Sequence, residues 1–257
     1  MLKVGWFTSG RGSGSRAMLA STLQAIEQGV LDAEIEFIFM HREFGEGDGS
    51  DDFIKFVNSL GIPLVSYSYK NFVDKQPKSA NKSRADYDNQ VKLLLEPYTP
   101  DICVLAGYLL ILSKPMTEEF KFINLHGALP GGPVGLWQSV IWDLILNHSK
   151  ESGINVFLVT PDLDRGPSIS FCKFDLSGPM FDSLWQNLGT MDIAAIKEHG
   201  VNQPLFKLIR EEGLRREPLI LIETINHISK SYNDLSLLGS LSPVDLTTVI
   251  DSKISIG

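Results

Sequence analysis

The sequence predicts an α/β protein with a mainly parallel, Rossmann-like sheet flanked by helices. Short apolar runs that are typical of buried strands occur at Leu2–Phe7, 33–40, 62–68, 101–112 and 123–127. Segments with helical spacing lie between them, at 15–29, 53–60 and 84–98. Because strands alternate with helices, we expect βαβ units with right-handed crossovers.

The second half of the chain continues this pattern with a helix over 136–147 and two strands, 153–160 and 168–174. From Met180 the spacing is helical, and the run 218–225 is compatible with either a strand or a helix. We expect one domain over residues 1–230, followed by a loosely attached tail at 231–257.

Composition and charge exclude several classes of protein. Lys and Arg number 23 against 31 Asp and Glu, which gives a net charge of −8 and disfavours a nucleic-acid partner. No apolar run reaches the length of about 20 residues that a membrane span needs. Cys103 and Cys172 lie in apolar runs and lack the spacing of a zinc site, so we expect buried free thiols and a cytoplasmic location.

A glycine-rich turn follows the first strand, in the run "TSGRGSGSRA" at 8–17. Such a turn directs backbone N–H groups and the positive end of the helix dipole at an anion, most often a phosphate. The run contains no GK[ST] and no third glycine of a dinucleotide fingerprint, so a plain tight turn is the alternative.

The run "INLHGALPGGPVG" at 123–135 holds two candidate catalytic residues. Residues two apart on a strand point to the same face, so Asn124 and His126 project together at the end of their strand. An amide can donate a hydrogen bond to a developing oxyanion, and an imidazole can move a proton near neutral pH. A purely structural histidine is the alternative reading.

Asp164, in the turn "VTPDLDRGP" at 159–167, is either a turn-forming residue or a carboxylate that orients His126. Asn124, His126 and Asp164 on neighbouring strand ends indicate acyl-type transfer. No serine or cysteine lies in a context typical of a nucleophile, and no cluster indicates a metal site. His41, His148 and His227 match no motif, and we expect them to be surface or structural residues.

The order of "NLH…LP" and "LDRGP", with "PDICVLAGYLLILS", "RADYD" and "KEHG", resembles the folate-dependent formyltransferases and most of all those that act on phosphoribosylglycinamide (GAR). The resemblance runs from about residue 2 to 215. It implies an enzyme that transfers a formyl group from 10-formyltetrahydrofolate to an amine in purine biosynthesis, without a metal.

The resemblance also implies a role for each matching residue. Asn124 would hold the oxygen of the tetrahedral adduct, protonated His126 would assist proton transfer, and Asp164 would hold His126 and relay a proton through water. The folate site would comprise Arg84 near the glutamate end or the formyl group, Tyr108, Leu109, Leu110, Ile111 and Leu112 around the pteridine, and Pro161, Asp162 and Leu163 as a second wall. The acceptor's phosphate would lie on Gly12, Ser13 and Gly14, with Glu198 facing its ribose.

Three departures from the family pattern concern the acceptor and phosphate regions. Gly127 and Ala128 replace Pro-Ser after the histidine, a longer "GSRAMLAST" follows "GRGS", and Leu110 stands where an arginine is common. They leave open a different small-molecule amine, such as an amino sugar nucleotide.

Three other functions remain as alternatives: hydrolysis of formyltetrahydrofolate, formylation of methionyl-tRNA, which the acidic charge disfavours, and non-catalytic ligand binding on the same scaffold. The sequence sets no oligomeric state.

Overall fold

We describe a computed structural model of the chain that covers residues 1–257. The description excludes residues 76–82, 163, 190–199, 232–233 and 257, and the side chain of residue 256. The strands run over β1 Leu2–Thr8, β2 Ala33–Met40, β3 Leu64–Ser66, β4 Ile102–Leu105, β5 Phe122–His126, β6 Glu151–Leu158, β7 Ser168–Asp175 and β8 Val244–Asp245. The α-helices run over α1 Ser13–Glu27, α2 Asp48–Leu60, α3 Tyr69–Asp74, α4 Arg84–Leu95, α5 Lys114–Glu119, α6 Trp137–Leu146, α7 Pro179–Leu188, α9 Pro204–Ser231 and α10 Thr247–Ile256.

In the described residues, eight strands form one sheet in the order β3-β2-β1-β4-β5-β6-β7-β8. Strands β1 to β5 pair in parallel, whereas β6 is antiparallel to both β5 and β7. The predicted mainly parallel sheet is therefore confirmed, with β6 as an antiparallel strand between β5 and β7. The connection from β6 to β7 is too short for a crossover, so that pair is necessarily antiparallel.

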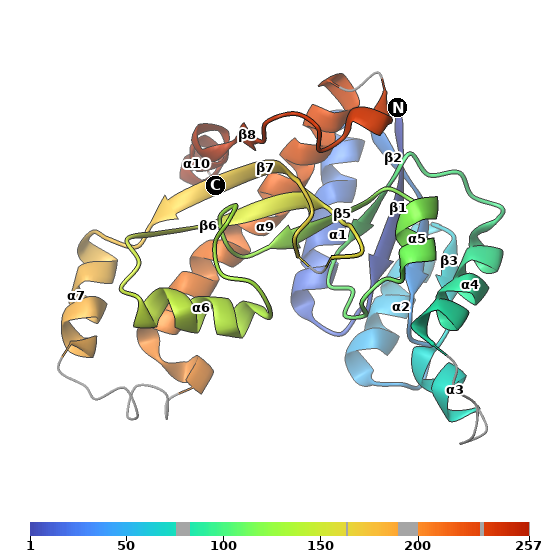
Figure 1. The fold of residues 1–257 in the computed structure, drawn as a ribbon, viewed down its shortest axis with the longest axis horizontal. Coiled ribbons are helices and arrows are strands. Elements are labelled where there is room, and N and C mark those ends of the chain that lie inside the picture. The colour runs from blue at the N-terminus through green and yellow to red at the C-terminus, as the bar shows by residue number, and fades with distance from the viewer. Residues whose placement is uncertain (76–82, 163, 190–199, 232–233, 257) are drawn as a thin grey trace.

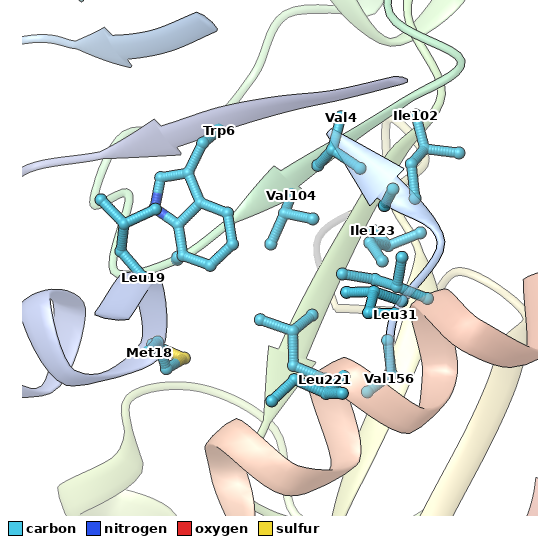
Figure 2. Packing of buried hydrophobic residues seen from close by; sticks show 14 of the residues in the cluster. Val4, Trp6, Met18, Leu19, Leu31, Ile102, Val104, Ile123, Val156 and Leu221 are labelled. Atoms are coloured by element: carbon cyan, nitrogen blue, oxygen red, sulfur yellow. The ribbon is translucent and has the colours of Figure 1, made fainter. Parts of the chain in front are cut away.

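Two layers of helices cover the sheet, and each buries one set of alternating strand residues. Trp6, Val104 and Ile123 face α1, α2 and α9 in the larger core, and Figure 2 shows Leu221 of α9 and Leu19 of α1 packed among them. The opposite set packs against α3, α4 and α5 in a core rich in aromatic residues that includes Phe7 and Phe122. Figure 1 shows these three helices together on the side of the sheet away from α9.

The helix ends follow local sequence signals. Ser83 and Asp86 form a capping box at the start of α4. Asp48 and Asp51 lie in the first turn of α2, where they oppose the positive end of the helix dipole, and Gly61 ends that helix in the left-handed conformation.

The C-terminal segment packs onto the domain. Strand β8 pairs in parallel with β7, and Leu246 and Ile250 are buried. Figure 1 shows α10 beside β8 at this edge of the sheet. The expected loose attachment is wrong for residues 244–256, and the division of the chain at residue 230 stays a prediction.

Candidate active site at the end of strand β5

Asn124 and His126 lie at the carboxyl end of β5, on the same face of the sheet as Phe122. Both side chains are half-buried. The apolar first half of β5 is fixed between β4 and β6, and this holds the two polar residues at the sheet edge where ligands bind in α/β proteins. The structure thus brings the predicted amide and imidazole together.

The glycine-rich loop after β5 turns back onto His126. Nε2 of His126 lies 2.7 Å from the carbonyl oxygen of Pro133. Gly131 and Gly135 have φ values of 78° and 105°, which glycine adopts without strain. Because a carbonyl only accepts hydrogen bonds, Nε2 carries the proton, and Nδ1 is left for proton transfer or for contact with a substrate.

Asp164 lies in the loop between β6 and β7 and has a φ of 53°, which is uncommon for a residue other than glycine. The turn packs closely on β6, since a Cβ at Gly166 would lie 1.6 Å from the carbonyl oxygen of Leu158. Among the described residues, no ion pair joins Asp164 to His126 within 4.0 Å. The role of Asp164 in holding His126 and relaying a proton through water, which the resemblance implied, stays a prediction.

Asn155 is a neighbour of His126 that the sequence analysis did not identify. It lies directly opposite His126 in the antiparallel β5–β6 pair, so the two Cβ atoms lie about 5 Å apart on the same face. Its side chain is 9% exposed, and its buried Oδ1 has no hydrogen-bond partner. A buried amide oxygen without a partner is costly, and its place beside His126 makes Asn155 a further candidate functional residue.

The loop after β4 presents the residues expected to bind folate. Leu109 and Ile111 are 56% and 60% exposed, whereas Leu112 is buried and Leu110 is half-buried. No backbone–backbone hydrogen bond holds residues 108–112 within the described part of the chain. These N–H and C=O groups are therefore free to bind a flat polar ring.

Gly107 joins this loop to the glycine-rich turn after β1. The backbone N–H and the hydroxyl of Ser9 both donate to the Gly107 carbonyl, at 3.1 and 2.8 Å. Ser15 packs so closely that a Cβ at Gly107 would meet its Oγ at 2.4 Å. The two loops are thus joined by direct contacts from the buried residues Ser9 and Ser15.

The N-terminus of α1 has the features of an anion site. Its N-cap is Gly12, no side chain caps it, and its first turn holds no acidic residue. Gly12 and Ser13 are exposed and Gly14 is partly exposed. Free N–H groups and the helix dipole favour an anion here.

Arg84 does not extend toward solvent. Its Nη2 lies 2.9 Å from Asp88 Oδ1 and donates to the Tyr108 hydroxyl at 3.0 Å, and its side chain is only 19% exposed. The guanidinium also lies over the rings of Tyr69 and Tyr87. This arrangement suits a residue that supports the folate loop more than one that binds folate directly.

His41 lies beneath the same loop, with its ring centroid 5.1 Å from that of Tyr108. It is 7% exposed, and its Nε2 has no hydrogen-bond partner. Burial, together with the positive charges of Arg84, Arg42 and Arg11, lowers the pKa of His41 to about 4. Burial also raises the pKa of the Tyr108 hydroxyl above its usual value, although Arg84 opposes this.

The remaining predicted residues fall in two groups. Pro161 and Asp162 are exposed in the turn after β6. Leu163 and Glu198 lie outside the described residues. In the part of the chain that is described, no group of three His, Cys, Asp or Glu side chains could hold a metal ion. None of the helices in that part is both long and apolar enough to cross a membrane.

The sequence is similar to known enzymes of one-carbon transfer. A phosphoribosylglycinamide formyltransferase of Dictyostelium discoideum is 27% identical over 167 residues, which cover 61% of this chain and 77% of the relative. A methionyl-tRNA formyltransferase of Thermosipho melanesiensis is also 27% identical, over 60% of this chain and 48% of the relative.

The fold is similar to that of a phosphoribosylglycinamide formyltransferase of Coxiella burnetii, with a TM-score of 0.62 and 22% identity over 88% of this chain and 85% of that one. The family model described as formyl transferase matches residues 11–175. This match spans more than half of the sequence and includes Asn124, His126 and Asp164. The chain therefore belongs to the formyl transferase family.

Proposed function

We propose that this chain transfers a formyl group from 10-formyltetrahydrofolate to the amine of phosphoribosylglycinamide. The observation that carries the proposal is the placement of Asn124 and His126 on one face at the carboxyl end of β5, with Nδ1 of His126 left free by the Pro133 contact.

The chemistry needs a tetrahedral centre to form and collapse. When the amine attacks the formyl carbon, negative charge develops on the formyl oxygen, and the amide N–H of Asn124 stabilises it. Protonated His126 donates from Nδ1 to the same oxygen and then assists the removal of the proton from the amine. When the adduct collapses, the bond between the formyl carbon and N10 of the folate breaks, and the proton lost by the amine passes to N10, so that tetrahydrofolate leaves as the neutral amine. Because no ion pair within 4.0 Å joins Asp164 to His126 here, we propose that a water molecule links them during the relay.

The loop 107–112 fits the folate ring, with free backbone groups at its edge and the side chains of Leu109 and Ile111 presented outward. Pro161, Asp162 and Leu163 form the second wall in this proposal. We assign the phosphate of the acceptor to Gly12, Ser13 and Gly14, and its ribose to Glu198, which lies outside the described residues.

The choice of acceptor rests on the relatives rather than on a contact in the structure. A place in purine biosynthesis follows if the acceptor is phosphoribosylglycinamide. We place the reaction in the cytoplasm, in keeping with two buried, unpaired cysteines.

A single assay separates the possible functions. We would follow the release of 5,8-dideazafolate from 10-formyl-5,8-dideazafolate by absorbance, with and without phosphoribosylglycinamide. Release that needs the amine supports the proposal. Release without any amine would identify a hydrolase, the activity named for a similar structure from Burkholderia mallei, a formyltetrahydrofolate deformylase with a TM-score of 0.60 and 19% identity. No release with any of a panel of amines, amino sugar nucleotides included, would overturn catalysis.

The same assay tests the role of His126. We expect His126→Ala to lower kcat by about 100-fold or more, since both proton transfer and oxyanion stabilisation are lost. Near-normal turnover in this variant would remove His126 from the mechanism.

A further inference from the structure

Two side chains on α4 hold the loop 107–113 at both of its ends. The guanidinium of Arg84 donates to the hydroxyl of Tyr108 at 3.0 Å, near the start of the loop. The backbone N–H of Ser113, at its end, donates to Oδ2 of Asp88 at 2.7 Å. The two side chains are themselves paired at 2.9 Å, one helical turn apart.

We propose that Arg84 and Asp88 are positioning residues that set the shape of the folate-binding loop without touching folate. This inference rests on the proposed function, because it assumes that folate binds to residues 108–112. It replaces the expectation, drawn from the family resemblance, that Arg84 contacts the folate itself.

The burial of this pair supports a positioning role. Asp88 is 0% exposed, and its Oδ1 contacts Arg84 Nη2 as an ion pair at 2.9 Å without forming a hydrogen bond. The Nε and Nη1 atoms of Arg84 are also buried without hydrogen-bond partners, so both nitrogens are closed off from solvent. The rings of Tyr69 and Tyr87 lie 5.1 and 4.8 Å from the guanidinium carbon. The guanidinium is therefore enclosed by aromatic rings and fixed in orientation, which makes it a rigid support.

The loop has few other anchors between its ends. Residues 108–112 make no backbone–backbone hydrogen bond in the described part of the chain. Tyr108 packs on Phe7, with ring centroids 5.7 Å apart, and on His41. Leu112 is buried in the same core, but Leu109 and Ile111 point outward. The path of the free backbone between Tyr108 and Ser113 thus depends strongly on the two contacts with α4.

The test is equilibrium binding of 10-formyl-5,8-dideazafolate to the full chain by calorimetry, combined with hydrogen–deuterium exchange of the loop. Asp88→Ala removes the acceptor for the Ser113 amide and leaves Arg84 without its partner. We expect the Kd for the folate to rise at least tenfold and the Ser113 amide to exchange faster. Asp88→Asn keeps an acceptor oxygen of the same shape, so it should recover part of the affinity.

Lys92→Met is the matched control. Lys92 lies on the same helix and is paired with Glu119 at 2.8 Å, and no hydrogen bond or ion pair of the described residues joins its side chain to the loop. Its loss should leave both folate affinity and Ser113 exchange unchanged. Tyr108→Phe is the milder variant if Asp88→Ala does not fold, because it removes only the hydroxyl that accepts from Arg84. A roughly threefold rise in Kd is expected.

Steady-state kinetics adds a readout that a general loss of structure would not give. Folded Asp88→Asn should raise the KM for folate and leave the KM for the amine unchanged. Folded Asp88→Ala and Tyr108→Phe variants that both bind folate within twofold of the wild type would overturn the positioning role. If the wild-type chain itself bound no folate, the proposed function would fail instead. Faster exchange of the Ser113 amide in Asp88→Ala would still show that Asp88 holds the end of the loop.

Discussion

The imidazole of His126 is held by the carbonyl of Pro133, seven residues further along the chain, at 2.7 Å. This contact explains why an easily bent loop follows the histidine. The glycines let the chain fold back onto β5, so that the carbonyl of Pro133 reaches His126. This carbonyl accepts a hydrogen bond from Nε2 and thereby decides which ring nitrogen carries the proton. The loop is thus part of the catalytic apparatus that we propose.

Gly131→Ala should weaken this arrangement. Its φ of 78° is left-handed, so a Cβ costs about 1–2 kcal/mol and shifts the loop, although no atom lies within 4 Å of the new carbon. We expect kcat to fall about tenfold, measured at saturating folate and amine. Gly29→Ala is the control, since Gly29 has a φ of 68° and equally open surroundings but lies at the far end of α1. An equal loss of kcat in both variants would contradict the link between the loop and His126.

Asn155→Leu should make the protein more stable and less active. Leucine replaces a buried amide whose oxygen has no hydrogen-bond partner, so we expect the free energy of unfolding to rise by about 1 kcal/mol. Because the amide lies opposite His126, kcat should fall about tenfold. Urea denaturation and the transfer assay measure the two effects. Asn226, on α9, also has a buried unpaired oxygen, and Asn226→Leu should raise stability at unchanged kcat. Full activity of Asn155→Leu would show that Asn155 has no part in the reaction.

His41 should make the fold sensitive to acid. Its pKa is about 4 in the folded chain, against 6.5 when unfolded, so the unfolded state binds more protons between these values. The contribution of His41 to the free energy of unfolding is complete above pH 6.5 and is lost as the pH falls toward 4. The free energy of unfolding should therefore fall by about 2 kcal/mol between pH 7 and pH 5. Denaturation curves recorded at several pH values should show that the free energy of unfolding of His41→Gln falls less steeply between pH 7 and pH 5 than that of the wild type. The exposed His148 serves as the control, and His148→Asn should keep the wild-type slope. Equal slopes for His41→Gln and the wild type would refute this origin of the acid sensitivity.

Ile250→Ala tests whether α10 is part of the cooperative fold. The side chain is 0% exposed, so its truncation should destabilise the protein by about 3 kcal/mol. Val249, the preceding residue, is 39% exposed, and Val249→Ala should change stability by less than about 0.5 kcal/mol. A single denaturation transition that shifts only for Ile250→Ala supports one folding unit. No shift in the main transition would support a separate tail.

The sequence was sufficient to predict the sheet class, because apolar runs alternate with helical spacing along most of the chain. It also placed Asn124 and His126 on one face, since the period of a strand decides this locally. The choice between strand and helix for 218–225 could not be made, because proline at position 218 argues against a helix interior. The structure has α9 running through Pro218, and packing of Ile220, Leu221 and Ile225 in the larger core supports it there.

Contacts between residues that lie far apart in the chain could not be predicted from the sequence. Asn155 stands in an apolar run, and only the register of the antiparallel pair shows that it faces His126. Likewise, the family resemblance implies that Arg84 lies near the folate, whereas its contact with Tyr108 forms only through the packing of α4 on the loop after β4. Such pairings depend on tertiary structure, which no local pattern encodes.

The bonds from Ser9 to the Gly107 carbonyl have a consequence for how two substrates could meet. The loop after β4 would bind the formyl donor, and the glycine-rich turn after β1 would bind the acceptor's phosphate. The two segments meet at the carbonyl of Gly107. A ligand that shifts the Gly107 carbonyl itself would therefore move both, whereas a change confined to the Ser113 end of the loop need not reach the acceptor side. Occupancy of either side should therefore change the affinity of its neighbour, and by thermodynamic reciprocity the factor must be the same in both directions.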